Sequence, residues 1–363
     1  MKEKKNLIVI CIFIISIVII LFGGALIYNK FFFKKSYSEV ETIMKEATVK
    51  YFSKYEEKLP KDINISITVS VDTLVKNNMM DTVVSYTKDK NVTCEGEVSV
   101  TNINCNYIYT PRLDCGDNYK TQTLINYIDD NVSIVTDGNG LYKMDNTLVY
   151  RGDSVDNYLK LNSKTYRIVK FVDQHPVIIF TDNSESVQWD DRYNINNDSD
   201  SGINDYEKSR MKEYLIKKYK SNLKDALLNS DSRMLVTSYN LPIGRRKNAD
   251  TDKTGTLENA QILTNQYIGL LPVSDFLNAS LDENCNSTIA ESCKNYNYLN
   301  KYKYTWWTVT ANSTNSYKVY TINKTATTAQ PSNQAYVRPV FYLAKDTIYV
   351  SGDGSKTNPF IVK

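Results

Sequence analysis

One stretch of this chain has the spacing of the oxygen ligands that bind calcium in EF-hand loops. Asp250, Asp252 and Thr254 stand at positions 1, 3 and 5 of such a loop, and Gly255 stands at position 6. Position 12 is Gln261 rather than the bidentate glutamate, and no helical pattern precedes the loop. We therefore assign no metal and no cofactor, and name Asp250, Asp252, Thr254 and Gln261 as the ligands that calcium would use here.

The cysteines are the next candidates for chemistry, because thiols bind zinc, form disulfides or act as nucleophiles. Outside the apolar N-terminal run they fall into two groups: Cys94, Cys105 and Cys115, then Cys285 and Cys293. Their spacing is wider than the two to four residues of a zinc knuckle. Disulfides in an oxidising compartment fit better. Cys285 and Cys293 would then close a small loop, and one thiol of the first group would be left over. The alternative is five reduced cysteines.

Nucleophilic catalysis has little support in this sequence. The only histidine, His175, precedes Pro176 between two strand-like runs, where a turn is expected. Nothing singles out two of the 41 acidic residues as a glycosidase pair. We predict no catalytic residue.

Two further patterns are typical of binding. Arg151-Gly152-Asp153 is a tripeptide that integrins bind, although a turn is the simpler explanation of its residues. Trp189, Trp306, Trp307 and the 28 tyrosines could form a surface on which sugars stack. Aromatic side chains are more often buried, and we expect this of Trp307, which lies in a strand-like run.

An apolar segment determines where these groups would work. It begins at Leu7, ends at Tyr28 and carries no charge, which is long enough for a membrane-spanning helix. Gly23 and Ala25 would suit a signal peptidase, but the apolar run before them is longer than a signal-peptide core. This length favours an uncleaved anchor. Residues beyond 35 carry a slight acidic excess, so we expect no nucleic-acid partner.

For the rest of the chain the sequence predicts an α+β fold. Val40, Met44, Ala47 and Tyr51 recur at helical spacing within a helix predicted over residues 37–59, which Pro60 ends. Further helices are predicted at residues 71–76 and 207–220. Strands are predicted at residues 63–69, 97–100, 106–110, 159–161, 166–169, 177–180, 306–309, 317–322 and 337–343. Pro111 and the Cys115-Gly116 pair are expected to end the first unit.

Six stretches resemble an uncharacterised domain of membrane-anchored surface proteins from low-GC Gram-positive bacteria. They are residues 152–169 (GDSVDNYLK, then YRIV), 189–194 (WDDRYN), 202–206 (GINDY), 267–271 (YIGLL), 337–340 (VRPV) and 351–360 (SGDGSKTNPF). The family usually has Trp where this chain has Tyr166. The resemblance covers most of residues 120–363 and implies a C-type-lectin-like fold, similar to that of formylglycine-generating enzymes. It carries no known activity.

Residues 37–115 resemble, more loosely, a pilin-like module, in which a membrane helix continues outward and packs on a small sheet. The prepilin signature around the apolar run is missing. The resemblance implies that the last strand returns to the start of the sheet and that a terminal Cys-Gly pins it. On that basis we predict a Cys94–Cys115 disulfide, with Cys105 as the odd thiol, beside the local pair Cys285–Cys293.

These patterns together predict three regions: a short cytoplasmic tail and transmembrane anchor at 1–35, a pilin-like helix-plus-sheet module at 36–117, and a connector with a C-type-lectin-like domain at 118–363. We expect a single-pass protein of the cell membrane whose C-terminal domain is extracellular and binds a ligand, either a glycan or a protein. The alternatives are an enzyme acting on envelope polymers and a structural subunit of a pilus-like assembly.

Structural features separate these alternatives. Polar residues clustered in a deep pocket would favour the enzyme, and a flat aromatic patch would favour binding. A structural subunit should expose the apolar stripe of Val40, Met44, Ala47 and Tyr51. The identity of the ligand and the oligomeric state do not follow from the sequence.

Overall fold

The computed structural model describes residues 34–62, 65–88, 90–103, 106–161, 163–182, 185–221, 227–228 and 230–363. The predicted membrane anchor and Cys105 lie outside these residues. Within them, no helix combines the length and apolar character needed to span a bilayer. The chain divides after Thr121 into a smaller N-terminal unit and a larger unit, Gln122–Lys363. This division falls a few residues beyond the predicted boundary at 117.

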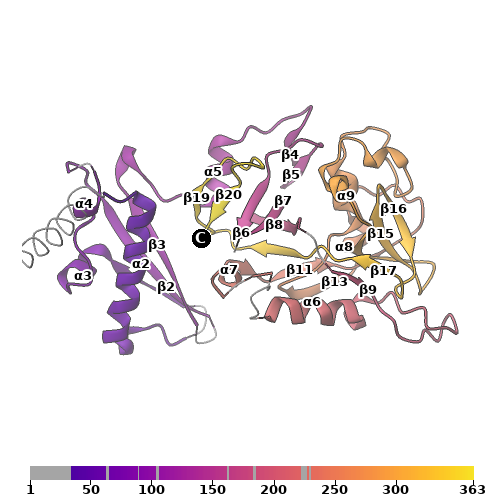
Figure 1. Ribbon diagram of the computed structural model, residues 1–363, viewed down its shortest axis with the longest axis horizontal. Coiled ribbons are helices and arrows are strands. Elements are labelled where there is room, and N and C mark those ends of the chain that lie inside the picture. The colour runs from indigo at the N-terminus through magenta and orange to yellow at the C-terminus, as the bar shows by residue number, and fades with distance from the viewer. Residues whose placement is uncertain are drawn as a thin grey trace, which may run out of the picture. The chain divides into compact units, whose positions relative to one another are not determined.

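The smaller unit consists of a long helix and a three-stranded antiparallel sheet with the order β1-β2-β3 (Figure 1). Its elements are α2 (Tyr37–Lys54), β1 (Ser66–Ser70), α3 (Val71–Lys76), α4 (Val83–Tyr86), β2 (Glu95–Ile103) and β3 (Asn106–Asp114), with 3-10 turns at Glu56–Lys58 and Gly116–Asn118. The mixture of helix and antiparallel sheet confirms the α+β class. It also confirms the short helix predicted at residues 71–76.

Helix α2 buries its apolar stripe against its own sheet. Ser36 and Glu39 form a capping box that begins the helix. Val40 and Met44 are fully buried, and Ala47 and Tyr51 nearly so. They pack in one core with the sheet's inward residues, which alternate along β2 and β3. The exposed stripe by which a structural subunit would be recognised is therefore not found at these four residues.

Proline does not end the module where the sequence suggests. Pro111 lies within β3 and is the register partner of Val98 on β2. Strand β3 pairs only with β2, so it is an edge strand of the three, and an edge strand tolerates the missing N–H of proline.

The two ends of the smaller unit meet. The rings of Tyr37, at the start of α2, and Tyr119 stack with centroids 4.9 Å apart. Thr121 donates its hydroxyl to the buried carboxylate of Glu41 and accepts the main-chain N–H of Leu113 at 2.7 Å. We call the contact formed by Tyr37, Glu41, Tyr119 and Thr121 the clasp. It fastens the segment after β3 to the first turns of α2.

The larger unit contains two sheets and a two-stranded ribbon. Its helices are α5 (Leu124–Asn131), α6 (Arg210–Lys220), α7 (Ser230–Met234), α8 (Thr256–Asn259) and α9 (Val273–Ala279), with 3-10 turns at Tyr206–Lys208, Glu291–Lys294 and Tyr298–Lys301. Its strands are β4 (Gly140–Met144), β5 (Thr147–Arg151), β6 (Tyr158–Leu161), β7 (Lys164–Val172), β8 (His175–Phe180), β9 (Ser186–Gln188), β10 (Val236–Thr237), β11 (Tyr239–Pro242), β12 (Arg245–Arg246), β13 (Ile262–Gln266), β14 (Trp306–Asn312), β15 (Val319–Asn323), β16 (Thr325–Ala329), β17 (Gln334–Tyr336), β18 (Val340–Leu343), β19 (Tyr349–Ser351) and β20 (Phe360–Val362).

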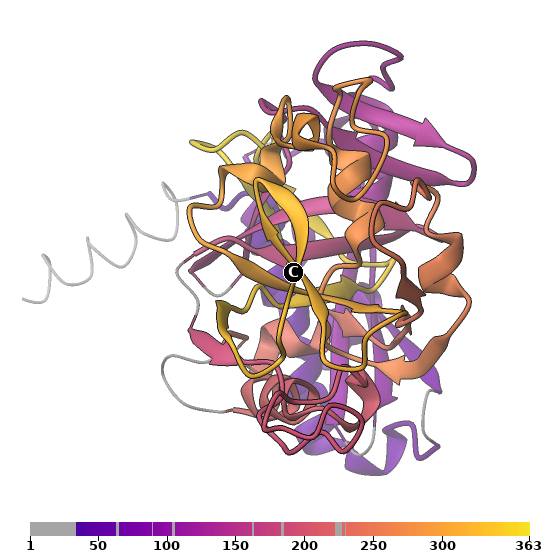
Figure 2. The same ribbon diagram turned by 90° about the vertical axis from the view of Figure 1, so that its right-hand side faces the viewer.

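The first sheet has the order β10-β18-β8-β7-β6-β20-β19, and the β4–β5 hairpin joins it through β7. The second has the order β16-β15-β14-β17-β9, with β12 beside β14. Strand β20 returns the C-terminus to lie parallel to β6. Figure 2 shows the second sheet and its loops facing the viewer.

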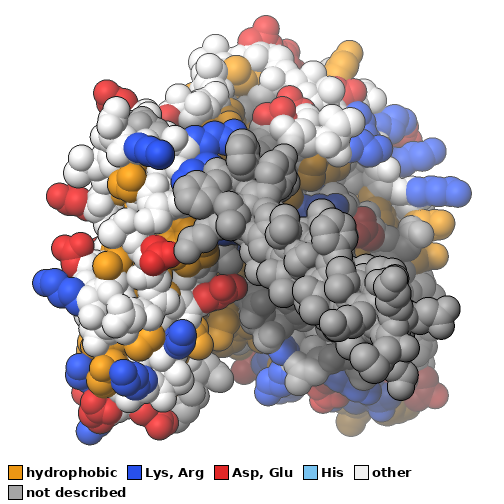
Figure 3. Space-filling view, turned by 60° about the vertical axis from the view of Figure 1, so that its left-hand side comes forward, with side chains coloured by type: hydrophobic (Ala, Val, Ile, Leu, Met, Phe, Trp, Pro, Cys, Tyr) orange, Lys and Arg blue, Asp and Glu red, His pale blue; other side chains and the backbone are white. Residues whose placement is uncertain are grey.

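Helix α9 connects the two sheets, since it contacts β5 of the first and β14 of the second. One continuous core, with Trp189, Trp307 and Phe276 among its largest side chains, fills the larger unit. At the surface, basic and acidic side chains are interspersed over the described residues that Figure 3 shows, in keeping with the near balance of charge.

Candidate functional site

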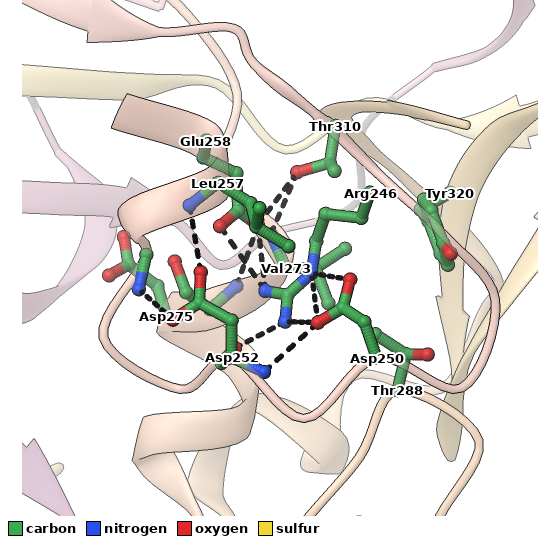
Figure 4. Close-up of polar contacts among 12 residues, drawn as sticks. Arg246, Asp250, Asp252, Leu257, Glu258, Val273, Asp275, Thr288, Thr310 and Tyr320 are labelled. Atoms are coloured by element: carbon green, nitrogen blue, oxygen red, sulfur yellow. Dashed lines mark hydrogen bonds and ion pairs between the residues drawn. The ribbon is translucent and has the colours of Figure 1, made fainter. Parts of the chain in front are cut away.

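The calcium-like loop exists, but an arginine side chain occupies its interior (Figure 4). Arg246 on β12 is fully buried. Its Nε donates to Asp250 Oδ2 at 2.9 Å, and its Nη2 donates to the same carboxylate and to the main-chain oxygen of Asp252. The Asp252 carboxylate instead accepts main-chain N–H groups, including that of Leu257 at 2.8 Å. The loop therefore folds around a guanidinium group.

Glu258 of α8 completes this cluster on the other side of the guanidinium. Its carboxylate accepts hydrogen bonds from Nη1 of Arg246 at 3.0 Å, from the N–H of Ser274 at 3.2 Å and from the hydroxyl of Thr310 at 3.2 Å. Burial raises the pKa of Glu258, and Arg246 opposes that shift. Burial would lower the pKa of Arg246, but its hydrogen bond with Asp250 and the nearby Glu258 carboxylate raise it. The arrangement is that of a fixed internal cation.

The remaining calcium candidates do not converge. The Thr254 hydroxyl donates to Asp252 Oδ1 at 2.7 Å, and Gln261 is exposed, with its main-chain oxygen accepting from Ile243. Throughout the part of the chain that the structure describes, no group of three or more His, Cys, Asp or Glu side chains could hold a metal ion.

Both predicted disulfides are confirmed. Cys94 bonds to Cys115, which joins the start of β2 to the end of β3, and Cys285 bonds to Cys293. Both cysteines of the second pair are fully buried, so this bond packs against the core of the larger unit. Buried bonds of this kind are structural and not catalytic.

The histidine and the Arg-Gly-Asp tripeptide are both parts of the fold. His175 is the first residue of β8, and its ring Nδ1 lies 2.9 Å from the main-chain oxygen of Leu343. Arg151 donates to the main-chain oxygens of Asn278 and Ser280, and its guanidinium lies 4.8 Å from the centroid of the Tyr142 ring. The geometry gives no support to adhesion through this tripeptide, because its arginine is held against the domain.

The tryptophans do not form a sugar-binding surface. All three side chains are at most 1% exposed, which confirms the expectation for Trp307. The indole N–H of Trp307 donates to the main-chain oxygen of Val187 at 2.9 Å, and that of Trp189 to Thr308 at 3.3 Å. They join the strands of the second sheet to the segment around β9.

A buried lysine–aspartate pair is the arrangement most similar to a catalytic one. Lys170 of β7 lies 2.6 Å from Asp275 of α9. Burial would lower the pKa of Lys170, but the Asp275 carboxylate and Tyr342 hold it above its ordinary value. The adjoining cavity has a volume of about 10 Å³, which is room for one water molecule. The cavity is too small for a substrate, although 17% of the Lys170 side chain is exposed.

The smaller unit has an open groove of about 630 Å³ near the ends of β2 and β3. Its charged lining has both signs: Asp72, Glu95, Glu97, Arg112, Asp114 and Lys120. Asp114 and Lys120 pair at 2.8 Å, and hydrogen bonds from Lys120 and Gly116 lower the pKa of Asp114. The volume suits a ligand, but no described polar group is buried and unpartnered there.

Three tyrosines of the larger unit form a partly exposed cluster. Tyr304 and Tyr336 stack with ring centroids 4.3 Å apart, and Tyr302 meets both edge-on at 5.9 and 6.3 Å. All three side chains are partly exposed. We call Tyr302, Tyr304 and Tyr336 the tyrosine patch. The three tyrosines come from two segments of the chain. A hydrogen bond of 2.9 Å from the Tyr336 N–H to the main-chain oxygen of Thr305 joins these segments.

The patch rests on a buried cation. The guanidinium of Arg338 lies 4.6 Å from the ring centroid of Tyr302 and 5.0 Å from that of Trp306. Its Nε donates to the main-chain oxygen of Phe180 at 3.1 Å. Arg338 is only 3% exposed, and its guanidinium supports these two aromatic rings. Cation–π contacts and backbone bonds thus hold the patch in one geometry.

Comparison of the chain with protein-family models, curated proteins and solved structures finds no match. Sequence reasoning named neither the tyrosine patch nor the partner of the Asp250 loop. The signals were available: Tyr302-x-Tyr304 alternates ahead of a strand, and Arg246 lies four residues before Asp250.

Proposed function

We propose that this chain is a single-pass cell-surface protein that presents a ligand-binding domain outside the cell, and that the tyrosine patch is its binding surface. In this proposal residues 7–28 anchor the chain, the smaller unit is a pilin-like stalk and the larger unit is a C-type-lectin-like domain. The observation that carries the binding role is the patch itself, three partly exposed rings that pack on one another, with Arg338 against the ring of Tyr302. Tyrosines that are held rigid and remain accessible dominate binding surfaces.

The two disulfides support the location. Disulfides persist in oxidising compartments and are rare in reducing ones. The alternatives receive less support. The stripe required for a pilus-like subunit is buried, and the Lys170–Asp275 pair that could serve an enzyme adjoins a cavity no larger than a water molecule.

A binding screen tests this function. The full chain, purified in detergent micelles, is applied to an array of glycans and to an array of extracellular proteins, with the Tyr304→Ala variant in parallel. We expect saturable binding to at least one component by the wild-type chain, and its loss in the variant. Binding that survives in Tyr304→Ala would locate the site elsewhere. Turnover of an envelope polymer, or no binding on either array, would overturn the proposal.

A further inference from the structure

The tyrosine patch has positively charged neighbours. Lys301 and Lys303 alternate with Tyr302 and Tyr304 in the sequence, and both lysines are exposed. The ammonium group of Lys303 lies 5.6 Å from the ring centroid of Tyr304. None of the ion pairs formed among the described residues involves either lysine. The patch therefore combines aromatic rings with two exposed lysines that form no ion pair within the described part of the chain.

The size of the patch limits the occupant. Three partly buried tyrosine rings leave on the order of 200 Å² open, given the full area of such side chains. A standard protein interface takes about 800 Å² from each partner. The patch alone is too small for a protein partner, whereas it matches a ligand of one or two rings.

The chemistry of the patch narrows the ligand class further. An aromatic ring is electron-rich on its faces, so it attracts the weakly positive C–H groups on the face of a sugar. The lysines attract a negative substituent on the same ligand. Their exposure keeps each electrostatic contribution small and dependent on salt.

We propose that Tyr302, Tyr304 and Tyr336, with Lys301 and Lys303, bind a saccharide that carries a negative group, either a carboxylate or a phosphate. This inference rests on the proposed binding function and names its ligand class. The aromatic rings supply most of the affinity, and the lysines select for charge. A rigid support below the rings lowers the entropy that binding costs, since Arg338 already fixes Tyr302.

The test compares matched ligands and matched variants. The full chain is titrated calorimetrically with three oligosaccharides of equal length. Hyaluronan oligosaccharides carry carboxylates, glucose oligomers with 6-phosphate groups carry phosphates, and cello-oligosaccharides are neutral. We expect the anionic probes to bind at least tenfold more tightly than the neutral one at low salt. Tyr304→Ala and Tyr336→Ala should each weaken binding about tenfold. Lys303→Gln should weaken it about threefold and reduce the salt dependence.

Controls keep folding and binding separate. Tyr304→Phe preserves the ring and should bind like the wild type, whereas Tyr267→Ala removes a tyrosine that is 47% exposed and lies outside the patch, and should have no effect. Equal affinity for neutral and anionic sugars, with Tyr304→Ala still inactive, would overturn the charge selection and leave the binding function intact. Binding of single-stranded oligonucleotides at the patch, or of proteins alone, would overturn the inference.

Discussion

Replacing Arg246 by methionine tests whether the Asp250 loop folds around a fixed cation. The substitution keeps much of the side-chain volume and removes the charge, so two carboxylates lose their partner. One of them, on Glu258, is almost fully inaccessible, and Asp250 is mostly buried. Breaking a buried ion pair by removing one member costs about 3–5 kcal/mol. For a domain of this size about 2–4 °C are lost per kcal/mol, so the unfolding midpoint should fall by about 6–20 °C.

The loss in Arg246→Met should depend on pH. Burial already raises the pKa of Glu258 and Arg246 opposes that shift, so the variant allows that pKa to rise further. An acid whose folded pKa lies above its unfolded value, about 4.3, contributes its full stability below pH 4.3. It loses that stability as the pH rises through the folded pKa. The variant should therefore lie closest to the wild type near pH 4 and farthest from it at neutral pH.

Thermal and chemical denaturation of the full chain at several pH values would measure this. The matched control is Arg210→Met, which removes an arginine paired with Asp191 at the surface, where the side chain is 57% exposed. That change should cost less than about 1 kcal/mol. If Arg246→Met behaved like Arg210→Met, the buried cluster would not stabilise the larger unit and our reasoning on this loop would be refuted.

Three more outcomes are expected. Thermal melts with a chelator and with millimolar calcium should coincide, because Arg246 occupies the loop; a calcium-dependent rise that Asp250→Ala abolishes would contradict this. Hydrogen bonds from Ser355 lower the pKa of Asp353, so this carboxylate stabilises the fold above about pH 4 and loses its effect as the pH falls through the lowered pKa. In Asp353→Asn the melting midpoint should fall less steeply between about pH 4 and 2 than in the wild type. The same pH dependence in both would contradict this role of Asp353. Protease added to intact cells should remove the larger unit and leave a fragment containing residues 7–28; protection of the whole chain would contradict the proposed topology.

Periodicity predicted the elements that bury an apolar face. The stripe of α2, the short helix α3 and strands β7, β8, β14 and β18 lie where alternation or helical spacing indicated them. Helix α9 was missed, although it connects the two sheets. The helix has only seven residues, which are too few to establish a helical period, and its polar Ser274 and Asp275 are buried instead of facing solvent. The prediction that Pro111 ends the first unit was wrong, because proline, which lacks an N–H, interrupts a strand only where that N–H would have a hydrogen-bond partner.

The site was harder to predict for a different reason. A loop of oxygen ligands has the same sequence pattern whether a metal ion or a side chain fills it, and only the structure brings Arg246 into the Asp250 loop. The tyrosine patch joins Tyr304 to Tyr336, which are distant in sequence and indistinguishable from the other tyrosines of this chain. Their accessibility depends on how the second sheet folds. In contrast, the two disulfide pairs could be predicted, because local spacing and a resemblance each restricted the choice.

The clasp of the smaller unit has a mechanical consequence. Because Tyr37 stacks on Tyr119 and Glu41 holds Thr121, a pulling force enters and leaves this unit at one place. The sheet bears no load until the clasp opens. Once it does, the Cys94–Cys115 bond shields the hairpin between those cysteines, and only the chain outside that bond can extend. Roughly 65 residues would then lengthen the smaller unit by about 200 Å. If the chain is anchored as proposed, shear would extend this unit in one defined step, set by the opening of the clasp.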